Sequence, residues 1–310
     1  MLTAMSSPKR LVIRCPASRR PEAFRQLHAG LPSDQQAALP QALERAVADD
    51  PDAWDGLFVC DGGDARADTD SIAGVVWVQP LPGNTAVIWP PDPHSVALEP
   101  LLHAAAAFVD ERDFPLAQMV VSANDDYPLD VVARSGFGQL VELMYLYRDL
   151  LGYSGSPKGL QFIPHAGDHS ARLAAILQST YAGTKDCPAL DGIRPLDEVI
   201  DGYRAQGEYL PEHWYLVNDG SADVGALIVA YHRGVENCEL VYMGVTPQAR
   251  GRGLGKQIVQ FALNASATIG AKRLVLAVDS ANSPALKVYG DLNFLPWDRR
   301  VVYARLRAPA

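Results

Sequence analysis

The sequence predicts an α/β protein built from two copies of one folding unit. The chain has 310 residues, about twice the length of a typical domain. Strand-like apolar runs alternate with amphipathic helical segments, and their order is nearly the same in residues 1–150 and 160–310. Residues 151–159 between them are short and rich in Gly and Ser, which is typical of a linker. We therefore expect two α/β (α+β) domains, each a mixed, mostly antiparallel sheet flanked by helices.

The first half divides into elements by its hydrophobic periodicity. A short strand at 11–14 precedes two amphipathic helices. Apolar runs bounded by turn residues then predict further strands, and two segments of helical period lie among them. The expected strands are 11–14, 57–60, 72–78, 85–89, 119–122 and 141–147, and the expected helices are 20–29, 35–49, 96–112 and 127–135.

The second half repeats this order with a clearer pattern. Three successive runs at its centre predict an antiparallel meander, which is followed by the most regular helix of the chain. The expected strands are 160–163, 215–217, 225–231, 239–245, 274–278 and 300–306, and the expected helices are 168–181, 196–206, 251–269 and 283–292.

Composition excludes several classes of function. The 27 Lys and Arg against 36 Asp and Glu give a net charge of −9, and most of the acidic excess lies in the first half, so a nucleic-acid partner is not expected. No apolar window is long enough to span a membrane, and the N-terminal residues lack the apolar run of a signal peptide. The four cysteines are widely spaced and show no metal-ligand pattern. We expect a cytoplasmic protein without a metal site or a membrane partner.

The segment Glu239–Gln260 carries the strongest functional signal. A strand leads through a turn into a helix whose start is rich in glycine, and Arg250, Arg252 and Lys256 add positive charge there. Free N–H groups and the dipole at a helix start attract an anion, and glycines let its backbone approach closely. This combination indicates a pyrophosphate-binding helix N-terminus.

Two common phosphate motifs do not fit this segment. The dinucleotide motif G-x-G-x-x-G would need a glycine where Lys256 stands. A Walker A loop would need a glycine at Arg250 and Ser or Thr at Gln257. The antiparallel meander before the turn is also the wrong context for either motif.

The segment instead resembles the GCN5-related N-acetyltransferase (GNAT) family, whose signature is Q/R-x-x-G-x-G/A. The run from Gln248 through Gly251 to Gly253 fits it, and the offset run from Arg250 to Gly255 fits it as well. The resemblance implies a GNAT fold for residues 160–310 and acetyl-CoA as cosubstrate. It also implies a set of cofactor-binding positions: Met243, Val245, Gln248, Arg250, Gly251, Arg252, Gly253, Gly255, Lys256 and Asn282.

A second stretch, from Asn282 to Phe294, is similar to the family's N-x-x-A-x-x-x-Y-x-x-x-G-F. It departs from the pattern at Asn293, where glycine is usual, but Asn tolerates a left-handed backbone. In the family the tyrosine of this pattern lies near the thioester sulfur as general acid, a role that the resemblance carries to Tyr289. A core tyrosine is the alternative. Asn282 would hold the cofactor or simply cap the helix.

Direct acyl transfer needs a polarised thioester carbonyl, a proton for the thiolate and a base for the amine. A backbone N–H near the strand end at Met243–Val245 can polarise the carbonyl. Glu239 stands where some family members place the base; an ordinary exposed strand glutamate or ion-pair partner is the alternative. Further candidate bases, each weaker on its own, are Asp186, Glu208 and His213.

The acceptor pocket is expected to involve the loop from Tyr181 to Gly192, because long loops of mixed chemistry are often functional. Cys187 lies in this loop, where a buried or incidental thiol is favoured over a reactive one.

The first half lacks the phosphate signal. Its corresponding segment, 85–97, has three prolines, no basic residue and Asp92, which would repel pyrophosphate. Val132 stands five residues before Phe137, as Tyr289 stands five before Phe294. This half therefore resembles a degenerate GNAT domain.

The leading hypothesis is an acetyl-CoA-dependent N-acetyltransferase with one active site, in the second half, acting on a primary amine of a small molecule. The alternatives are a non-catalytic acyl-CoA sensor and an enzyme that acetylates protein lysines or N-termini. The sequence gives no indication of the acceptor's identity or of the oligomeric state.

Overall fold

A computed structural model describes residues 11–31, 33–49, 52–62, 71–153, 155, 159–165 and 170–307. The chain folds into two compact units. The first unit comprises the described residues up to Leu140 together with those from Val301 on, and the second comprises Val141–Arg300. Each unit is described below by itself.

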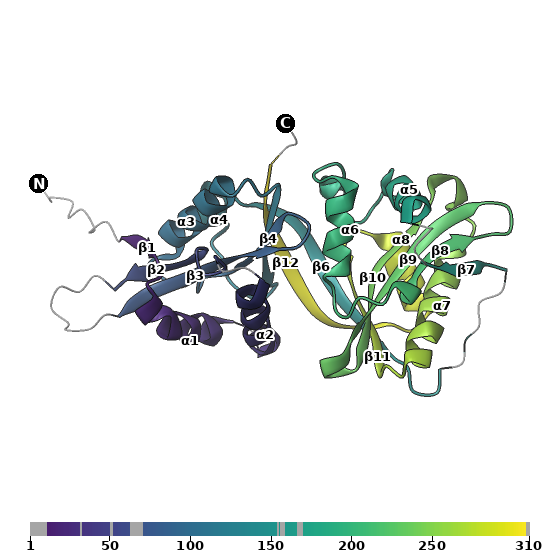
Figure 1. Ribbon diagram of the computed structural model, residues 1–310, viewed down its shortest axis with the longest axis horizontal. Helices are drawn as coiled ribbons and strands as arrows, with labels where there is room; N and C mark the ends of the chain where they lie inside the picture. The colour runs from purple at the N-terminus through teal and green to yellow at the C-terminus, as the bar shows by residue number, and fades with distance from the viewer. Residues whose placement is uncertain are drawn as a thin grey trace, which may run out of the picture. The chain divides into compact units, whose positions relative to one another are not determined.

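The first unit is a sheet with helices on both faces. Its strands follow the order β1-β2-β3-β4-β5-β12, antiparallel from β1 to β4 and parallel between β4 and β5. Helices α1 and α2 cover one face, and α3 and α4 cover the other (Figure 1). The elements are β1 Val12–Arg14, α1 Arg20–Gly30, α2 Ser33–Asp49, β2 Leu57–Asp61, β3 Ile72–Leu81, β4 Thr85–Trp89, α3 Leu98–Glu111, β5 Leu116–Ser122, α4 Leu129–Arg134 and β6 Gly138–Asp149, the last of which continues into the second unit.

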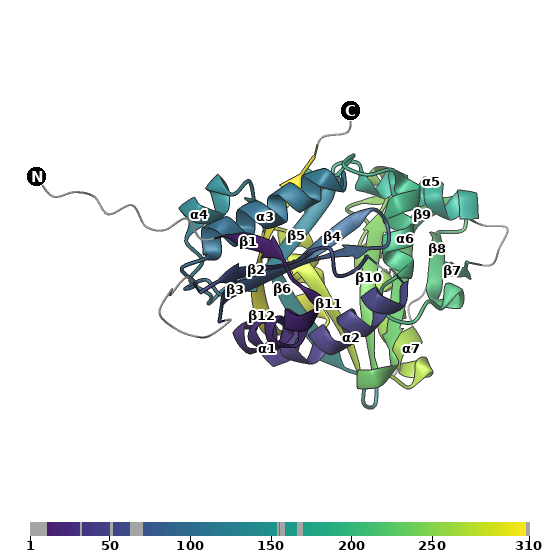
Figure 2. The same cartoon turned by 60° about the vertical axis from the view of Figure 1, so that its left-hand side comes forward.

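The second unit repeats this plan. Its strand order is β12-β6-β11-β10-β9-β8-β7, with β10 and β11 parallel and the pairs from β10 to β7 antiparallel (Figure 2). The elements are β7 Gln161–Pro164, α5 Ser170–Tyr181, α6 Leu196–Arg204, β8 Trp214–Asn218, β9 Asp223–His232, β10 Asn237–Val245, α7 Leu254–Ile269, β11 Arg273–Asp279, α8 Ser283–Asp291 and β12 Leu295–Leu306.

Two hydrophobic layers hold the second unit together. On one sheet face, α7 and α8 bury residues such as Ile258 and Tyr289 against β10 and β11. On the other, α5 buries Leu177 against Trp214 of β8 and Ile228 of β9. Each fully buried aliphatic side chain contributes roughly 2 kcal/mol. Packing on both faces holds the sheet in place. It thereby positions the residues at the end of β10, which leads into α7.

The two units exchange parts of strands. Twelve-residue strands span about 40 Å, and both β6 and β12 run from one unit into the other. Most of β6 pairs with β11 in the second unit, from Leu143↔Asp279 to Asp149↔Arg273. The later part of β12 lies in the first unit, where Tyr303 joins the core under α3.

The division of the chain therefore differs from the expected domains 1–150 and 160–310. Each half contributes part of its last strand to the sheet of the other unit, an exchange that hydrophobic periodicity cannot reveal. Of the expected linker 151–159, residues 154 and 156–158 lie outside the described residues, as do residues 168 and 169 of the helix expected at 168–181.

Most expected elements agree with the observed ones to within a few residues. The helix expected from residue 251 begins instead at Leu254, because Gly251 and Gly253 have φ of 76° and 75°, outside the helical region. The final strand begins at Leu295 rather than at residue 300. Asn293 has φ of 58°, so the turn before β12 keeps its left-handed backbone without glycine.

Candidate active site

The site forms where β10 separates from β11. These parallel strands pair only from Asn237↔Arg273 to Glu239↔Val275. Beyond that point β10 continues along β9, with one extra residue, Val241, between the pairs Leu240↔Val229 and Tyr242↔Ile228. Such a bulge bends a strand. The β11 side of the last part of β10 is thus free of a strand partner among the described residues, and an extended ligand can hydrogen-bond to it.

The far end of β10 leads into the start of α7. A short turn of 3₁₀ helix at Pro247–Ala249 is followed by Gly251 and Gly253, and Gly253 precedes the first helical residue. A Cβ at either glycine would meet no described atom within 4 Å, so their backbone is open to a ligand. No described side chain caps the first turn of α7, and the turn holds no acidic residue. Its N–H groups and dipole therefore favour an anion.

Three cations lie near this helix start but differ in their contacts. Lys256 is exposed in the first turn of α7, and no contact of its ammonium group is found among the described residues. Arg252 donates to Asp219 at 2.9 Å, and Ser221 and Arg252 together hold the pKa of that carboxyl well below its usual range. Lys256 is thus the cation best placed for a ligand phosphate, and Arg252 could reach one by leaving its exposed ion pair.

Arg250 makes several contacts within the protein itself. Its guanidinium donates to the carbonyl oxygens of Val245 at 3.1 Å, Gly183 at 3.0 Å and Thr180 at 2.8 Å. It therefore ties the end of α5 to the end of β10. These contacts give Arg250 a positioning role, and its expected contact with the cofactor stays a prediction.

The remaining expected cofactor residues lie on β10, in the turn before α7, in α7 and at the start of α8. Met243 and Val245 are half-buried on β10, Gln248 is exposed in the turn, and Gly255 lies close enough to Met243 that a Cβ would be 4.0 Å from its Cε. Asn282 accepts the Ala285 N–H at 3.3 Å and so caps α8. For Asn282 the capping alternative is thus realised in the structure.

Tyr289 lies in the α7–α8 layer directly beneath the sheet. It is 5% exposed and packs edge-on against Phe294 at 5.4 Å between ring centroids. Burial, reinforced by the negative charge of Asp186, raises the pKa of its hydroxyl well above the ordinary value. No described group hydrogen-bonds this hydroxyl, so it keeps its proton and is available to a ligand.

Glu239 lies on the opposite face of the sheet, the face covered by α5. Its carboxylate and the His232 Nε2 are 2.7 Å apart, and both side chains are about a third exposed. Glu239 pairs with Val275 and Tyr145 of β6 pairs with Ala277, two residues further along β11, so Tyr145 lies on the same face as Glu239. Burial, together with the charge of Glu239 and then of Asp298, raises the pKa of Tyr145 to about 12. Glu239 and Tyr289 thus flank the gap between β10 and β11 from its two sides.

The other candidate bases occupy different surroundings. Asp186 Oδ1 accepts the Asp279 N–H at 3.0 Å, and loss of hydration raises the pKa of its carboxyl although the residue is exposed overall. Glu208 is held by Arg233 through contacts as short as 2.9 Å. His213 contacts the Tyr215 hydroxyl at 3.1 Å, and burial lowers its pKa.

Cys187 follows Asp186 in the loop after α5. Its N–H donates to Asp279 Oδ2 at 3.3 Å, and its backbone lies in the left-handed region with φ of 44°. Burial and the neighbouring carboxylates raise the pKa of its thiol to about 12. The thiol is therefore protonated at neutral pH and a poor nucleophile.

A cluster of tyrosines beside the gap was not anticipated from the sequence. Tyr242, next to the bulge, contacts the Thr180 hydroxyl at 2.6 Å, and the hydroxyls of Tyr181 and Tyr203 are 3.0 Å apart. A side chain at Gly244 would collide with Thr180, since its Cβ would lie 2.7 Å from the Thr180 Cβ. No sequence motif links these residues. They meet because Tyr181 of α5 and Tyr203 of α6 pack against Tyr242 of β10.

The first unit lacks these features at its equivalent helix start. The Ser95 carbonyl accepts the Leu98 N–H at 3.0 Å, and the acidic Glu99 stands in the first turn of α3, so this helix start disfavours an anion. Asp92 accepts the His94 N–H nearby. Val132 is buried where the second unit has Tyr289.

The segment that builds the site is similar to a known protein family. Residues 181–294 match the acetyltransferase (GNAT) family. This match covers more than a third of the chain and lies wholly within the second unit. The matched residues run from the end of α5 through β10, α7 and β11 to the end of α8, and so include every element that builds the site.

Curated relatives and a solved structure extend the comparison. A mycothiol acetyltransferase of Nocardioides sp. is 40% identical over 82 residues, which are 26% of each chain. One of Pseudarthrobacter chlorophenolicus is 24% identical over 77% of this chain and 78% of its own. A GCN5-related N-acetyltransferase from Sphaerobacter thermophilus superposes with a TM-score of 0.63 over 98% of both chains, at 14% identity. The GNAT fold thus extends over both units.

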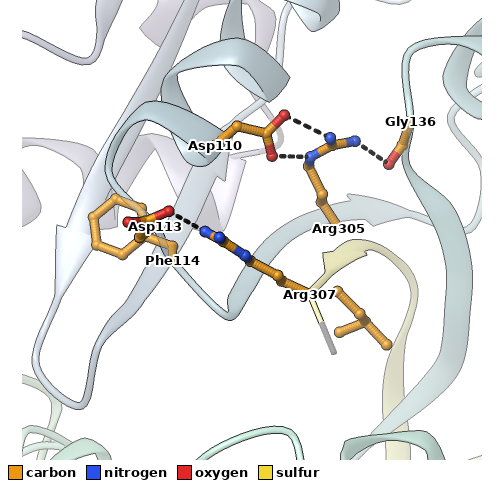
Figure 3. A pocket seen from close by; sticks show the side chains of 7 residues that line it. Asp110, Asp113, Phe114, Gly136, Arg305 and Arg307 are labelled. Carbon is orange, nitrogen blue, oxygen red and sulfur yellow. Dashed lines mark hydrogen bonds and ion pairs between the residues drawn. The ribbon is translucent and has the colours of Figure 1, made fainter. Parts of the chain in front are cut away.

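The first unit holds a hollow of about 360 Å³, lined in part by two arginines (Figure 3). Arg305 donates to both oxygens of Asp110, at 2.8 and 2.7 Å, and to the Gly136 carbonyl at 3.1 Å. Arg307 pairs with Asp113. Because both arginines are already paired with carboxylates, this hollow offers no free charge to a ligand.

The part of the chain that the structure describes contains no candidate membrane span and no candidate metal cluster. None of its helices is both long and apolar enough to cross a membrane. No group of three or more His, Cys, Asp or Glu side chains within it is arranged to hold a metal ion.

Proposed function

We propose that this GNAT protein transfers an acetyl group from acetyl-CoA to a primary amine of a small molecule, at one site in the second unit. The observation that carries the proposal is the start of α7, which has two left-handed glycines, no side-chain cap and an exposed lysine. It lies at the end of a strand whose β11 side is free. The described residues at the corresponding helix start of the first unit form no such arrangement.

The residues present fit acetyl-CoA. The open backbone at Gly251 and Gly253 would hold the pyrophosphate, assisted by Lys256. The free side of β10 near Met243 and Val245 would pair with the extended pantetheine arm, as a strand pairs with a sheet edge. The bound cosubstrate supplies an activated thioester, in which a C–N bond forms to the amine as the C–S bond breaks.

Glu239 and Tyr289 then handle the two protons. Glu239, positioned by His232, accepts the proton that the amine loses. Tyr289 donates a hydrogen bond to the departing sulfur and passes its proton to it. Because burial raises the pKa of Tyr289, hydrogen bonding to the developing thiolate contributes before proton transfer is complete. The proton balance closes when the proton taken up by Glu239 passes through water to Tyr289.

The relatives' names favour a small-molecule acceptor over a protein. They are called mycothiol acetyltransferases, although the aligned segment covers only about a quarter of the Nocardioides protein. A non-catalytic acyl-CoA sensor remains the alternative in which Tyr289 and Glu239 have structural roles.

The test is a calorimetric titration with acetyl-CoA, followed by an amine panel monitored through release of the free thiol. We expect one site per chain and turnover with at least one small amine. Tight binding without turnover on any amine would favour the sensor, and two sites would contradict the degenerate first unit.

Tyr289→Phe distinguishes a catalytic role of the Tyr289 hydroxyl from a structural one. It should leave the affinity for acetyl-CoA unchanged and lower kcat by about 10²-fold, because only the hydroxyl is removed from a packed ring. Equal activity of the variant and the wild type would remove Tyr289 from the mechanism.

A further inference from the structure

The floor of the acceptor side lies on β11, an interior strand of the second unit. It has β10 on one side and β6 on the other, and its residues Leu276 and Val278 are buried under α7 and α8. Ala277, which points to the opposite face, is solvent-exposed. Because β10 pairs with β11 only up to Val275, Ala277 has a strand partner on its β6 side alone, and its exposure shows that neither α5 nor α6 covers this patch.

Three groups border Ala277 on the same face. Glu239 of β10 is the strand partner of Val275, two residues before Ala277 on the same face of β11. Tyr145 of β6 is the direct strand partner of Ala277. Trp297 of β12 packs edge-on against Tyr145 at 5.7 Å between ring centroids and is 49% exposed. The patch thus has a carboxylate on one side and an aromatic wall on the other.

The ring of Tyr145 is held in place by Arg300. The Arg300 guanidinium stacks over its ring at 4.7 Å, and Arg300 is itself fixed by Asp298 at 2.7 Å. Glu239 and Tyr145 stand two strands apart, a separation of roughly 10 Å between their strands. On the strand between them, the exposed Ala277 leaves β11 without a large side chain at the level of Tyr145.

We propose that Tyr145 and Trp297 bind the body of the acceptor and select a primary amine carried on a ring, whose ammonium group Glu239 receives. Aromatic faces stack on flat or ring-shaped apolar surfaces and favour cations, whereas a flexible chain would lose more entropy on being ordered there. Tyr145 belongs by sequence to the first half, so that half selects the acceptor through its last strand.

This inference rests on the proposed transfer to an amine. The test compares tyramine and glucosamine, two ring-borne amines of different polarity, with cadaverine, a straight-chain amine. We expect the wild type to prefer one of the ring amines by at least tenfold in kcat/KM. The difference between tyramine and glucosamine then tells whether the wall receives an aromatic or a sugar ring.

Two variants address the wall directly. Trp297→Leu and Tyr145→Leu should each raise KM for the preferred ring amine about tenfold, abolish the preference over cadaverine and leave the affinity for acetyl-CoA unchanged. Ala277→Phe should fill the patch and block both amine types. The matched control is Tyr153→Phe, because Tyr153 packs on the opposite face beside α7, where its hydroxyl meets the Gln260 carbonyl at 3.5 Å.

The outcomes separate the two proposals. Turnover with unchanged amine preference in both wall variants overturns the wall and leaves the proposed function standing. A wild type that binds acetyl-CoA but acetylates no amine overturns the proposed function. Calorimetric titration of the three amines into the protein–CoA complex then judges the wall separately: binding weakened by Trp297→Leu supports it, and no binding overturns it.

Discussion

Gly253 offers a sharp test of the proposed pyrophosphate site. Gly253→Asp places a carboxylate at the start of α7, whereas Gly253→Asn adds an amide of the same shape without the charge. Since Gly253 has φ of 75° and a Cβ there would meet no described atom within 4 Å, neither variant clashes. The strain of a left-handed L-residue is about 1 kcal/mol and is lower for Asn and Asp than for other residues. Both variants should therefore unfold at nearly the same temperature.

Their affinities for acetyl-CoA should differ strongly. A carboxylate about 5 Å from one phosphate charge is repelled by about 3 kcal/mol at an effective dielectric constant of 20. That corresponds to a loss of roughly 100-fold in affinity for Asp relative to Asn. The Asn variant measures the steric part of the loss, and the ratio of the two dissociation constants isolates the charge.

The assay is calorimetric titration of acetyl-CoA at low and moderate salt. Because the repulsion is electrostatic, the difference between the variants should shrink as salt rises. Equal affinity of the Asp and Asn variants at low salt would refute the placement of a phosphate at this helix start.

Three further predictions follow from the contacts of the second unit. Arg250→Met should lower the free energy of unfolding by about 2 kcal/mol, because three carbonyl groups lose a charged donor; a change under about 0.5 kcal/mol in a denaturant titration would contradict the positioning role. The raised pKa of Asp186 means that the native state binds its proton more readily than the unfolded state, so its contribution to stability is lost as pH rises through the native pKa. The difference in free energy of unfolding between Asp186→Asn and the wild type should therefore be more favourable to the variant at pH 7 than at pH 4. An equal difference at both pH values would count against this. The native thiols should react slowly with a thiol reagent at pH 7, since Cys15, Cys60 and Cys238 are buried and burial raises the pKa of Cys187 to about 12; one fast-reacting equivalent would contradict this.

The sequence was informative wherever local periodicity or a motif decides the structure. The meander before α7 and the glycine-rich helix start could both be located, because strand alternation and positive-φ glycines leave local signals. The direction of a side chain is not local. Arg250 lies in the motif, yet its guanidinium points to α5, a partner that folding brings from about 70 residues earlier.

The acceptor side was the part least accessible to sequence reasoning. Glu239 was a candidate, but its neighbour His232 and the facing Tyr145 come from separate strands and have no common spacing. Tyr145 also lies before the expected linker and was therefore assigned to the other half. Its position follows from the register of β6 on β11, which depends on tertiary pairing.

The exchange of β6 and β12 has a consequence for synthesis on the ribosome. The first unit is made first, yet the strand that covers the outer side of its β5 is the later part of β12, which follows every other described strand in the chain. Until Val301–Leu306 emerges, β5 presents an open edge, and open edges invite pairing with other chains. We expect nascent or C-terminally shortened chains to depend on chaperones, and the first unit to become protease-resistant only after translation has passed β12.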